Sequence, residues 1–273
     1  MLRRRFRAMG TDVELLLNAE HGPQAELALD AAEQEVRRLE ELLSRFRPDS
    51  ELSRLNAGGR LDGAHRDLVQ VVELALAARV ATGGLFDPTV HDALVAAGYD
   101  RTFEDVPGDG PPAGPARPCA GGVTVEGSTI ALEPGTRIDL GGIAKGYAAD
   151  RACELLATAG PCLVNAGGDI AVGGGAWPIG VTDDLTLELS AGGLATSGRD
   201  RRTWRRGGEG QHHLIDPRTG RPAHSAAARV TVVGKSATQA EVLAKVAFLG
   251  GAVDAPHVVV DDNGQGVLAG GLA

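Results

Sequence analysis

Several features that mark specialised classes of protein are scarce or missing in this 273-residue sequence. Its cysteines are only Cys119, Cys153 and Cys162, an odd number without metal-ligand spacing, so a disulfide framework is not expected. No apolar run approaches the roughly eighteen residues of a membrane span. Positive charge is also short: 27 Lys and Arg against 36 Asp and Glu give a formal net charge of −9, which argues against general nucleic-acid binding.

The beginning of the sequence lacks the pattern of a targeting signal. Arg3, Arg4 and Arg5 provide positive charge, but Gly10 and Asp12 interrupt the apolar run that a signal peptide requires. We therefore expect no membrane insertion and, by default, a cytoplasmic location.

Common catalytic templates are missing as well. Gly234, Lys235 and Ser236 resemble the end of a phosphate-binding loop, but that loop needs a glycine where Arg229 stands. No zinc-protease motif, nucleophile elbow or dinucleotide-binding glycine motif occurs. The function has to be inferred from other segments.

The composition that remains is ordinary for a globular protein, 43% hydrophobic and 23% charged, and its 39 glycines and 14 prolines predict many turns. Helical spacing of apolar residues occurs over residues 23–46, 64–81, 143–159 and 238–249, and Ser50 could start a further short helix. Short β-like runs lie at residues 12–18, 123–125, 129–132, 162–165, 169–172, 178–181, 185–189, 229–233, 257–260 and 266–268.

The order of these elements favours an α+β fold, with mixed sheets and flanking helices, over a doubly wound sheet. Residues 104–122 are rich in Pro, Gly and Asp and predict a surface loop or linker. We expect a single domain over residues 1–273.

The segment at residues 138–150 is the strongest candidate for a ligand site. A predicted strand end delivers Asp139, Gly141 and Gly142 allow close approach of a ligand, and Lys145 falls in the first turn of a helix whose N-terminus favours anions. A buried aspartate capping the helix, with the glycines serving packing, would explain the same residues. The glycine turn at residues 165–169 is, by itself, most simply a hairpin.

Two further segments carry polar groups with two interpretations each. His213 precedes a tight Asp-Pro-x-x-Gly turn and could be a base held by it, although paired histidines are as often plain polar surface. Glu241 and Lys245 are four residues apart on one helix face, either as a simple ion pair or as a polar pair at a site entrance.

Seven segments in series resemble the ApbE family of FAD:protein FMN transferases. They include Asp-Leu-Gly-Gly-Ile-Ala-Lys-Gly at 139–146, Asn-Ala-Gly-Gly-Asp at 165–169 and His-Leu-Ile-Asp-Pro at 213–217, with others at 6–11, 44–56, 84–90 and 195–198. Each segment alone is weak, but the series runs from residue 6 to about residue 250. The resemblance implies the ApbE-like fold and FAD as substrate.

The resemblance also implies a reaction and its partners. Family members use a divalent cation, usually Mg²⁺, to transfer the FMN half of FAD to a Thr or Ser hydroxyl of a target flavoprotein, with release of AMP. Some also hydrolyse FAD. Such chemistry needs stabilisation of charge on phosphate oxygens and a base for the hydroxyl.

Roles follow from matching positions in the family. His213 is the implied general base, and Lys245 stands at a catalytic position. Gly142, through its carbonyl, and Glu241 are the implied cation ligands. FAD-binding positions are Met9, Phe46, Leu85, Phe86, Asp87, Asp139, Lys145 and Leu214.

This sequence departs from the family at two places. The family usually has Asp, then Thr, Ser or Asp four residues later, where this chain has Glu241 and Lys245. A protonated lysine cannot ligate a metal, so its ammonium either replaces the cation's charge beside the pyrophosphate or pairs with Glu241. The family's Trp before Gly-Phe is also missing, since residues 96–99 read Ala-Ala-Gly-Tyr, which predicts weaker stacking there.

Two functions therefore stay open. One is an active FMN transferase in which Glu241 retains the cation or Lys245 replaces it. The other is a non-catalytic protein that binds or delivers FAD and has lost the metal site.

Overall fold

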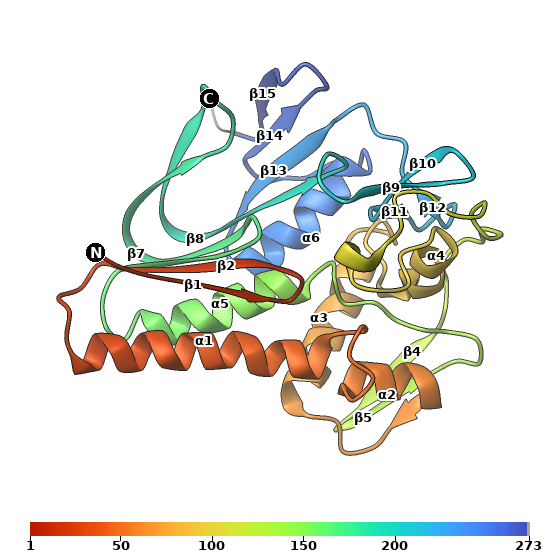
Figure 1. Cartoon of the computed structure of the whole chain (residues 1–273), viewed down its shortest axis with the longest axis horizontal. Helices are drawn as coiled ribbons and strands as arrows, with labels where there is room; N and C mark the ends of the chain where they lie inside the picture. The colour runs from red at the N-terminus through yellow and green to blue at the C-terminus, as the bar shows by residue number, and fades with distance from the viewer. Residues whose placement is uncertain (272–273) are drawn as a thin grey trace.

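The computed structural model describes residues 1–271 and has a large antiparallel sheet as its centre (Figure 1). Eight strands pair in the order β1-β2-β6-β7-β8-β13-β14-β15. Their bounds are β1 Leu2–Ala8, β2 Thr11–Leu17, β6 Cys162–Ala166, β7 Asp169–Gly180, β8 Thr186–Gly198, β13 Arg229–Gly234, β14 His257–Val260 and β15 Gly266–Ala269.

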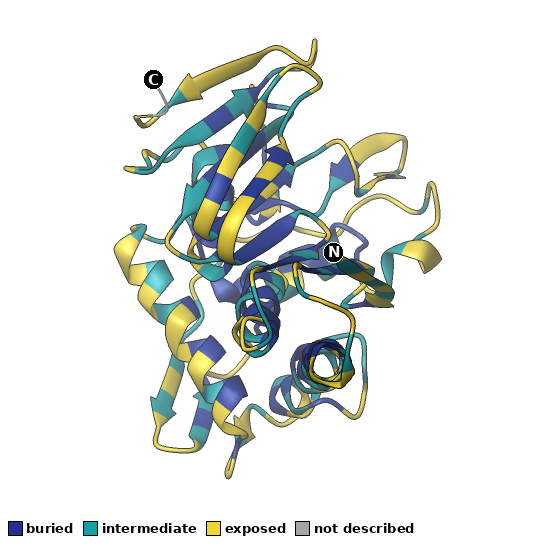
Figure 2. Cartoon of the chain, turned by 90° about the vertical axis from the view of Figure 1, so that its left-hand side faces the viewer, coloured by how far each residue is buried: buried dark blue, intermediate teal, exposed yellow. Residues whose placement is uncertain are grey.

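Three helices lie along this sheet. Helices α5 (Ala144–Leu156) and α6 (Ala237–Phe248) pack against its central strands, and α1 (Pro23–Leu43) packs outside α5 (Figure 1). Helix α1 buries an apolar stripe and leaves its other side in solvent, whereas nearly all of α5 and α6 is buried or half-buried. Figure 2 shows the buried residues gathered at the centre of the molecule and the exposed ones on its outside. These antiparallel sheets and helices confirm the predicted α+β class.

A smaller group of elements lies beyond the C-terminal end of α1 (Figure 1). It contains α2 (Glu51–Gly58), α3 (Arg66–Ala81) and a three-stranded sheet of β3 (Arg60–Leu61), β5 (Thr129–Leu132) and β4 (Val123–Glu126). Their apolar side chains share a core with the start of α5, so this group meets the large sheet close to residue 144. The remaining short elements are η1 Pro88–Val90, α4 His91–Ala96, η2 Phe103–Asp105, β9 Thr203–Arg206, β10 Glu209–His212, β11 Ile215–Asp216 and β12 Arg221–Pro222.

The end of α1 differs from the prediction in a way that matters for the site. The helix was expected to reach Phe46 but ends at Leu43, because Ser44 adopts an extended conformation. Ser50 then accepts a hydrogen bond from the Ser53 N–H and caps α2, which confirms the predicted start of a short helix. The chain between the two helices is thereby released to line a cavity.

Most predicted strands and helices are present within one to four residues of the expected bounds, but β8 extends nine residues beyond the predicted run at 185–189. Two further corrections apply. The runs at 169–172 and 178–181 are one strand, β7, with an irregular register against β8 between Gly173 and Trp177. No strand leads into Asp139, because the backbone of Ile138 bonds with the side chain of Asn56 at 2.8 Å instead of with a neighbouring strand.

The predicted loop at 104–122 has no regular structure after η2. Strand β1, by contrast, was not predicted. It is an edge strand whose residues are mostly half-exposed, so it lacks the apolar alternation that marks a half-buried strand. Within residues 1–271, no helix has the length and apolar character needed to cross a bilayer.

Candidate active site

Two cavities meet between the large sheet and the smaller group of elements. The apolar chamber, of about 260 Å³, is walled by residues such as Leu43, Phe46, Phe86, Tyr99 and Leu214. The polar chamber, of about 910 Å³, lies along β1, β2, β7 and β8. Both are lined by the same junction residues, which are Gly10, Phe103, Gly141, Lys145, Arg202, His213 and Lys245.

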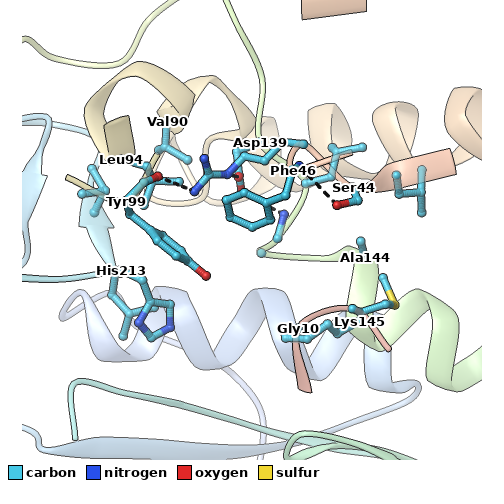
Figure 3. A pocket seen from close by; sticks show the side chains of 18 of the residues that line it. Gly10, Ser44, Phe46, Val90, Leu94, Tyr99, Asp139, Ala144, Lys145 and His213 are labelled. Carbon is cyan, nitrogen blue, oxygen red and sulfur yellow. Dashed lines mark hydrogen bonds and ion pairs between the residues drawn. The ribbon is translucent and has the colours of Figure 1, made fainter. Parts of the chain in front are cut away.

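The structure brings the predicted site residues together. Eleven of the twelve line the apolar chamber, and the exception, Glu241, is buried beneath it at 1% exposure. Figure 3 shows His213, Asp139, Phe46 and Lys145 around this cavity, although the sequence separates them widely. Their convergence in space was expected only from the resemblance.

Arginine 45 organises the aromatic wall of the apolar chamber. Its Nε lies 2.6 Å from an oxygen of Asp139, and its guanidinium donates to the Tyr99 carbonyl at 2.7 Å. The same group lies over the rings of Phe46 and Tyr99, at 4.1 and 4.8 Å from their centres. The Gly141 N–H donates to the other Asp139 oxygen at 2.8 Å, so this carboxylate is fully paired and does not cap α5.

Tyr99 belongs to an aromatic cluster in the wall of the apolar chamber. Its ring packs 5.5 Å from both Phe46 and Trp204, and the Trp204 Nε1–H donates to the Ala97 carbonyl at 2.7 Å. This aromatic cluster is assembled partly from β9, more than 100 residues away in the sequence.

Two other predicted FAD-binding residues, Asp87 and Met9, make hydrogen bonds that stabilise the wall of the apolar chamber. The Asp87 carboxylate is buried, pairs with Arg79 at 3.0 Å and accepts from the Thr89 N–H at 2.8 Å. Met9 has φ of 54° and donates its N–H to Glu40 at 2.6 Å, which holds the β1–β2 turn against α1. Both Asp87 oxygens thus have partners within the cavity wall.

The two adjacent histidines have different surroundings. His212 bonds through Nε2 with the Ala223 carbonyl at 3.0 Å and accepts the Leu214 N–H on Nδ1, so it holds the turn. His213 lines both chambers, and its buried Nδ1 has no hydrogen-bond partner among residues 1–271. Burial, reinforced by Arg202, Lys245, His212 and Lys145, holds the pKa of His213 well below 6.5, so the ring is neutral at pH 7.

A buried group of four charges, here named the lysine–carboxylate group, forms where α5 and α6 meet the sheet. It consists of Lys145, Asp169, Glu241 and Lys245. Lys145 contacts Asp169 and lies 2.5 Å from Glu241 Oε1, while the Lys245 Nζ is 3.2 Å from the same oxygen. Glu241 Oε2 accepts the Gly146 N–H at 2.9 Å.

Close crossing of α5 and α6 creates this group. A Cβ on Gly146 would lie 2.5 Å from the Ala237 carbonyl oxygen, so only glycine permits the approach. Asp150, one turn along α5, accepts from the N–H groups of Ala237 and Thr238 at 2.8 and 2.9 Å and fixes the start of α6.

Electrostatics within the group favour a charged Lys145 beside Glu241, whereas burial lowers the pKa of Lys245. Burial alone would raise the pKa of Glu241, but Lys145, Lys245 and the Gly146 N–H together lower it. Burial would lower the pKa of Lys145, but Asp169 and Glu241 raise it. Burial and the charge of Glu241 raise the pKa of Asp169 to about 6.

A divalent cation does not fit this arrangement of donors. Both oxygens of Glu241 already accept hydrogen bonds, and a Mg²⁺ at its usual distance from Oε1 would lie within about 5 Å of both ammonium nitrogens. Within residues 1–271 no group of three or more His, Cys, Asp or Glu side chains is arranged to hold a metal. The i,i+4 pair of Glu241 and Lys245 is confirmed, but Glu241 lies under the cavity and not at an entrance.

Sequence reasoning missed three residues of the site. Asp169 ends the glycine turn at 165–169, which is the predicted hairpin between β6 and β7, yet its carboxylate contacts Lys145. Arg45 also lay inside a recognised segment without an assigned role. Arg202, which donates to the Gly10 carbonyl at 3.1 Å, lies in a turn that gave no sequence signal.

Comparison with known proteins agrees with this geometry. The ApbE family profile matches residues 9–268. The FAD:protein FMN transferase of Treponema pallidum is 31% identical over 265 aligned residues, covering 83% of this chain and 73% of the relative. That of Vibrio cholerae is 30% identical over 233 residues, covering 74% and 67%.

Solved structures show the same fold. The ApbE protein of Thermotoga maritima superposes with a TM-score of 0.83 at 25% identity, covering 98% of this chain and 96% of that chain. The flavinyl transferase ApbE of Pseudomonas stutzeri gives 0.79 at 22% identity, covering 98% and 93%. With a profile match over nearly its whole length and relatives of this similarity, the chain belongs to the ApbE family.

Proposed function

We propose that this chain is an FAD:protein FMN transferase, which moves FMN from FAD to a Thr or Ser hydroxyl of a target flavoprotein and releases AMP. The observation that carries the proposal is the junction of the two chambers. An apolar, aromatic-walled chamber and a wider polar one meet at Lys145, Arg202, His213 and Lys245. FAD has two ring systems joined by a pyrophosphate, and this junction offers cations to its charged centre.

The reaction requires few covalent steps from the protein. The acceptor oxygen forms a bond with the phosphorus of the FMN half, the bond from that phosphorus to the bridging oxygen breaks, and AMP leaves with that oxygen. His213 takes the proton of the hydroxyl and returns it to solvent, which its neutral ring permits at pH 7. Lys145 and the rest of the lysine–carboxylate group hold the cationic junction in place.

Other expected properties are part of the same proposal. Met9, Phe46, Leu85, Phe86 and Leu214 provide contact surface for FAD, with Asp87, Asp139 and Lys145 fixing the cavity walls. The whole chain acts as one domain, since these residues lie on both groups of elements. FAD hydrolysis as a side activity and a cytoplasmic location remain predictions, the latter to be checked by cell fractionation.

The test is incubation of the purified full chain with FAD and an acceptor flavoprotein domain. AMP is measured by chromatography and covalent FMN by in-gel fluorescence and mass. His213→Ala should reduce transfer by about 100-fold or more, as loss of a general base does, whereas His21→Ala, on the surface, should not. FAD that binds but stays intact with Mg²⁺ or Mn²⁺ present would instead identify a non-catalytic FAD-binding protein.

A further inference from the structure

Two of the chain's three lysines meet in this site, although arginine supplies 24 of its 27 basic side chains. Lys145 and Lys245 belong to the lysine–carboxylate group, and the third, Lys235, is exposed. An ammonium is compact and can direct three hydrogens to several oxygens, whereas guanidinium presents a rigid planar fork. Lysine therefore suits a cavity in which protein carboxylates and phosphate oxygens compete for one cation.

The two lysines of the group differ in how many carboxylates they contact. Lys145 contacts both Asp169 and Glu241, so its ammonium is committed to the protein. Within residues 1–271, Lys245 pairs only with Glu241, at the longer distance of 3.2 Å, and it lines both chambers. Without Lys245, Glu241 keeps Lys145 and the Gly146 N–H. Lys245 can therefore bind an anion without leaving a buried carboxylate unpartnered.

The stem of Lys245 passes close to Gly142, one of the two residues that the resemblance makes cation ligands. A methyl group on Gly142 would be 3.1 Å from Lys245 Cε and 3.3 Å from Cδ, so the bare Gly142 backbone makes room for the stem. Gly142 and Glu241 are the two residues expected to ligate the metal, and Lys245 contacts both places. A basic side chain of the protein therefore lies beside both residues that were expected to hold the cation.

We propose, on the basis of the transferase function above, that the Lys245 ammonium supplies the positive charge at the FAD pyrophosphate and that this chain acts without a bound divalent cation. The ammonium donates hydrogen bonds to phosphate oxygens and stabilises the charge that develops on the bridging oxygen as AMP leaves. A fixed cation held by the fold needs no rearrangement during the reaction.

The first test uses the unaltered full chain. FAD affinity is measured by flavin fluorescence, and FMN transfer by covalent fluorescence, each in EDTA and in excess Mg²⁺. Binding of Mn²⁺ is followed by electron paramagnetic resonance, with free FAD as the reference. We expect affinity and rate in EDTA to stay within about twofold of their values in Mg²⁺, because no cation contact is lost. We expect no saturable Mn²⁺ site on the protein.

Variants then assign the charge to one residue. Lys245→Met should weaken FAD binding by about tenfold or more, the loss expected for a charge-assisted hydrogen bond, and Mg²⁺ should not restore it. Lys245→Arg should retain part of the affinity. Lys235→Met removes the same charge at an exposed position and should behave as the unaltered chain. Thermal unfolding of each variant shows whether it is folded.

Three results would overturn the inference: loss of affinity and transfer in EDTA with recovery in Mg²⁺, a stoichiometric Mn²⁺ site, or normal FAD binding and transfer in folded Lys245→Met. The EDTA and Mn²⁺ measurements on the unaltered chain test the inference even if the Lys245→Met variant does not fold. Failure of the transferase proposal looks different. In that case FAD stays intact under every condition, and neither AMP nor covalent FMN is formed. The FAD affinities of the unaltered chain and of the Lys245 variants still show whether Lys245 binds the pyrophosphate.

Discussion

Two buried ionic arrangements border the same cavity, and they differ in what they leave available. In the Arg45–Asp139 pair every major contact is internal: Arg45 also bonds with the Tyr99 carbonyl and lies over two aromatic rings, and Asp139 also accepts the Gly141 N–H. In the lysine–carboxylate group, Lys245 has one long contact and faces both chambers.

This difference in available contacts distinguishes charged residues that stabilise the cavity wall from charged residues that can bind a ligand. Burying an ion is costly, so a charge without a functional role is kept only when the protein satisfies it completely. The Arg45 side chain is 5% exposed and has a carboxylate, a carbonyl and two aromatic rings as partners. Lys245 is only partly satisfied, which is the arrangement expected of a group that completes its hydrogen bonds with substrate.

The largest effect should come from breaking the lysine–carboxylate group at its centre. Lys145→Met removes the shared partner of Asp169 and Glu241 and leaves two buried carboxylates poorly compensated. We expect the free energy of unfolding to fall by about 3–5 kcal/mol, measured by urea denaturation. Lys145→Met combined with Asp169→Asn should recover part of the loss. An unchanged stability would show that the group is not held together by Lys145.

Breaking the Arg45–Asp139 pair should cost less. Arg45→Met leaves Asp139 with the Gly141 N–H, so we expect a loss of about 2–3 kcal/mol in the same denaturation experiment. Adding Asp139→Asn should restore part of it, because the uncompensated charge is removed. If Arg45→Met impaired FMN transfer while stability and FAD binding were unaffected, Arg45 would take part in the reaction. The distinction between charges that stabilise the wall and charges that bind the ligand would then be wrong.

The sequence predicted most of the fold because apolar periodicity depends on local residues. It predicted α3, α5, α6 and the central strands, whose buried faces repeat regularly. It missed β1, since this Arg-rich edge strand has one exposed and one only half-buried face and therefore no apolar alternation. It also placed a strand before Asp139, where the apolar run is held by the side chain of Asn56 and not by a strand partner.

The site was predicted as a set of residues but not as a set of contacts. Family segments identified Lys145, Glu241 and Lys245, yet the contact between Lys145 and Glu241 joins residues 96 positions apart. It exists because Gly146 permits α5 and α6 to cross closely, which no local pattern encodes. The metal-ligand role expected for Glu241 was inferred without that contact, which puts the Lys145 ammonium beside the same carboxylate as Lys245.

Acidification should distinguish His213 from the carboxylates around it. Burial among cations lowers the pKa of His213 in the folded chain below the 6.5 of the unfolded chain, so stability is lost as the pH falls below about 6.5. The slope reaches up to about 1.4 kcal/mol per pH unit. Asp169, with its raised pKa, acts in the opposite direction, so the useful quantity is the difference between the unaltered chain and His213→Asn.

That difference is measured by urea denaturation between pH 7 and pH 5. We expect the unaltered chain to lose stability relative to His213→Asn on acidification. A constant difference would mean that His213 has an ordinary pKa and is hydrated, which would weaken its assignment as a neutral base.

The smallest effect concerns the segment that carries Arg45. The buried Ser50 hydroxyl accepts from the Ser53 N–H at 3.0 Å and donates to the Ser44 carbonyl at 2.6 Å, so one side chain both caps α2 and holds the turn after α1. Ser50→Ala should lower stability by about 1 kcal/mol. Ser53→Ala, whose longer contacts of 3.3 and 3.4 Å reach the same turn, is the matched control and should cost less. If Ser50→Ala also weakened FAD binding, and Lys235→Met did not, the position of Arg45 in the cavity wall would depend on the Ser50 cap. The buried Arg45–Asp139 pair would then need the hydrogen bonds of the neighbouring turn as well as its own opposite charges.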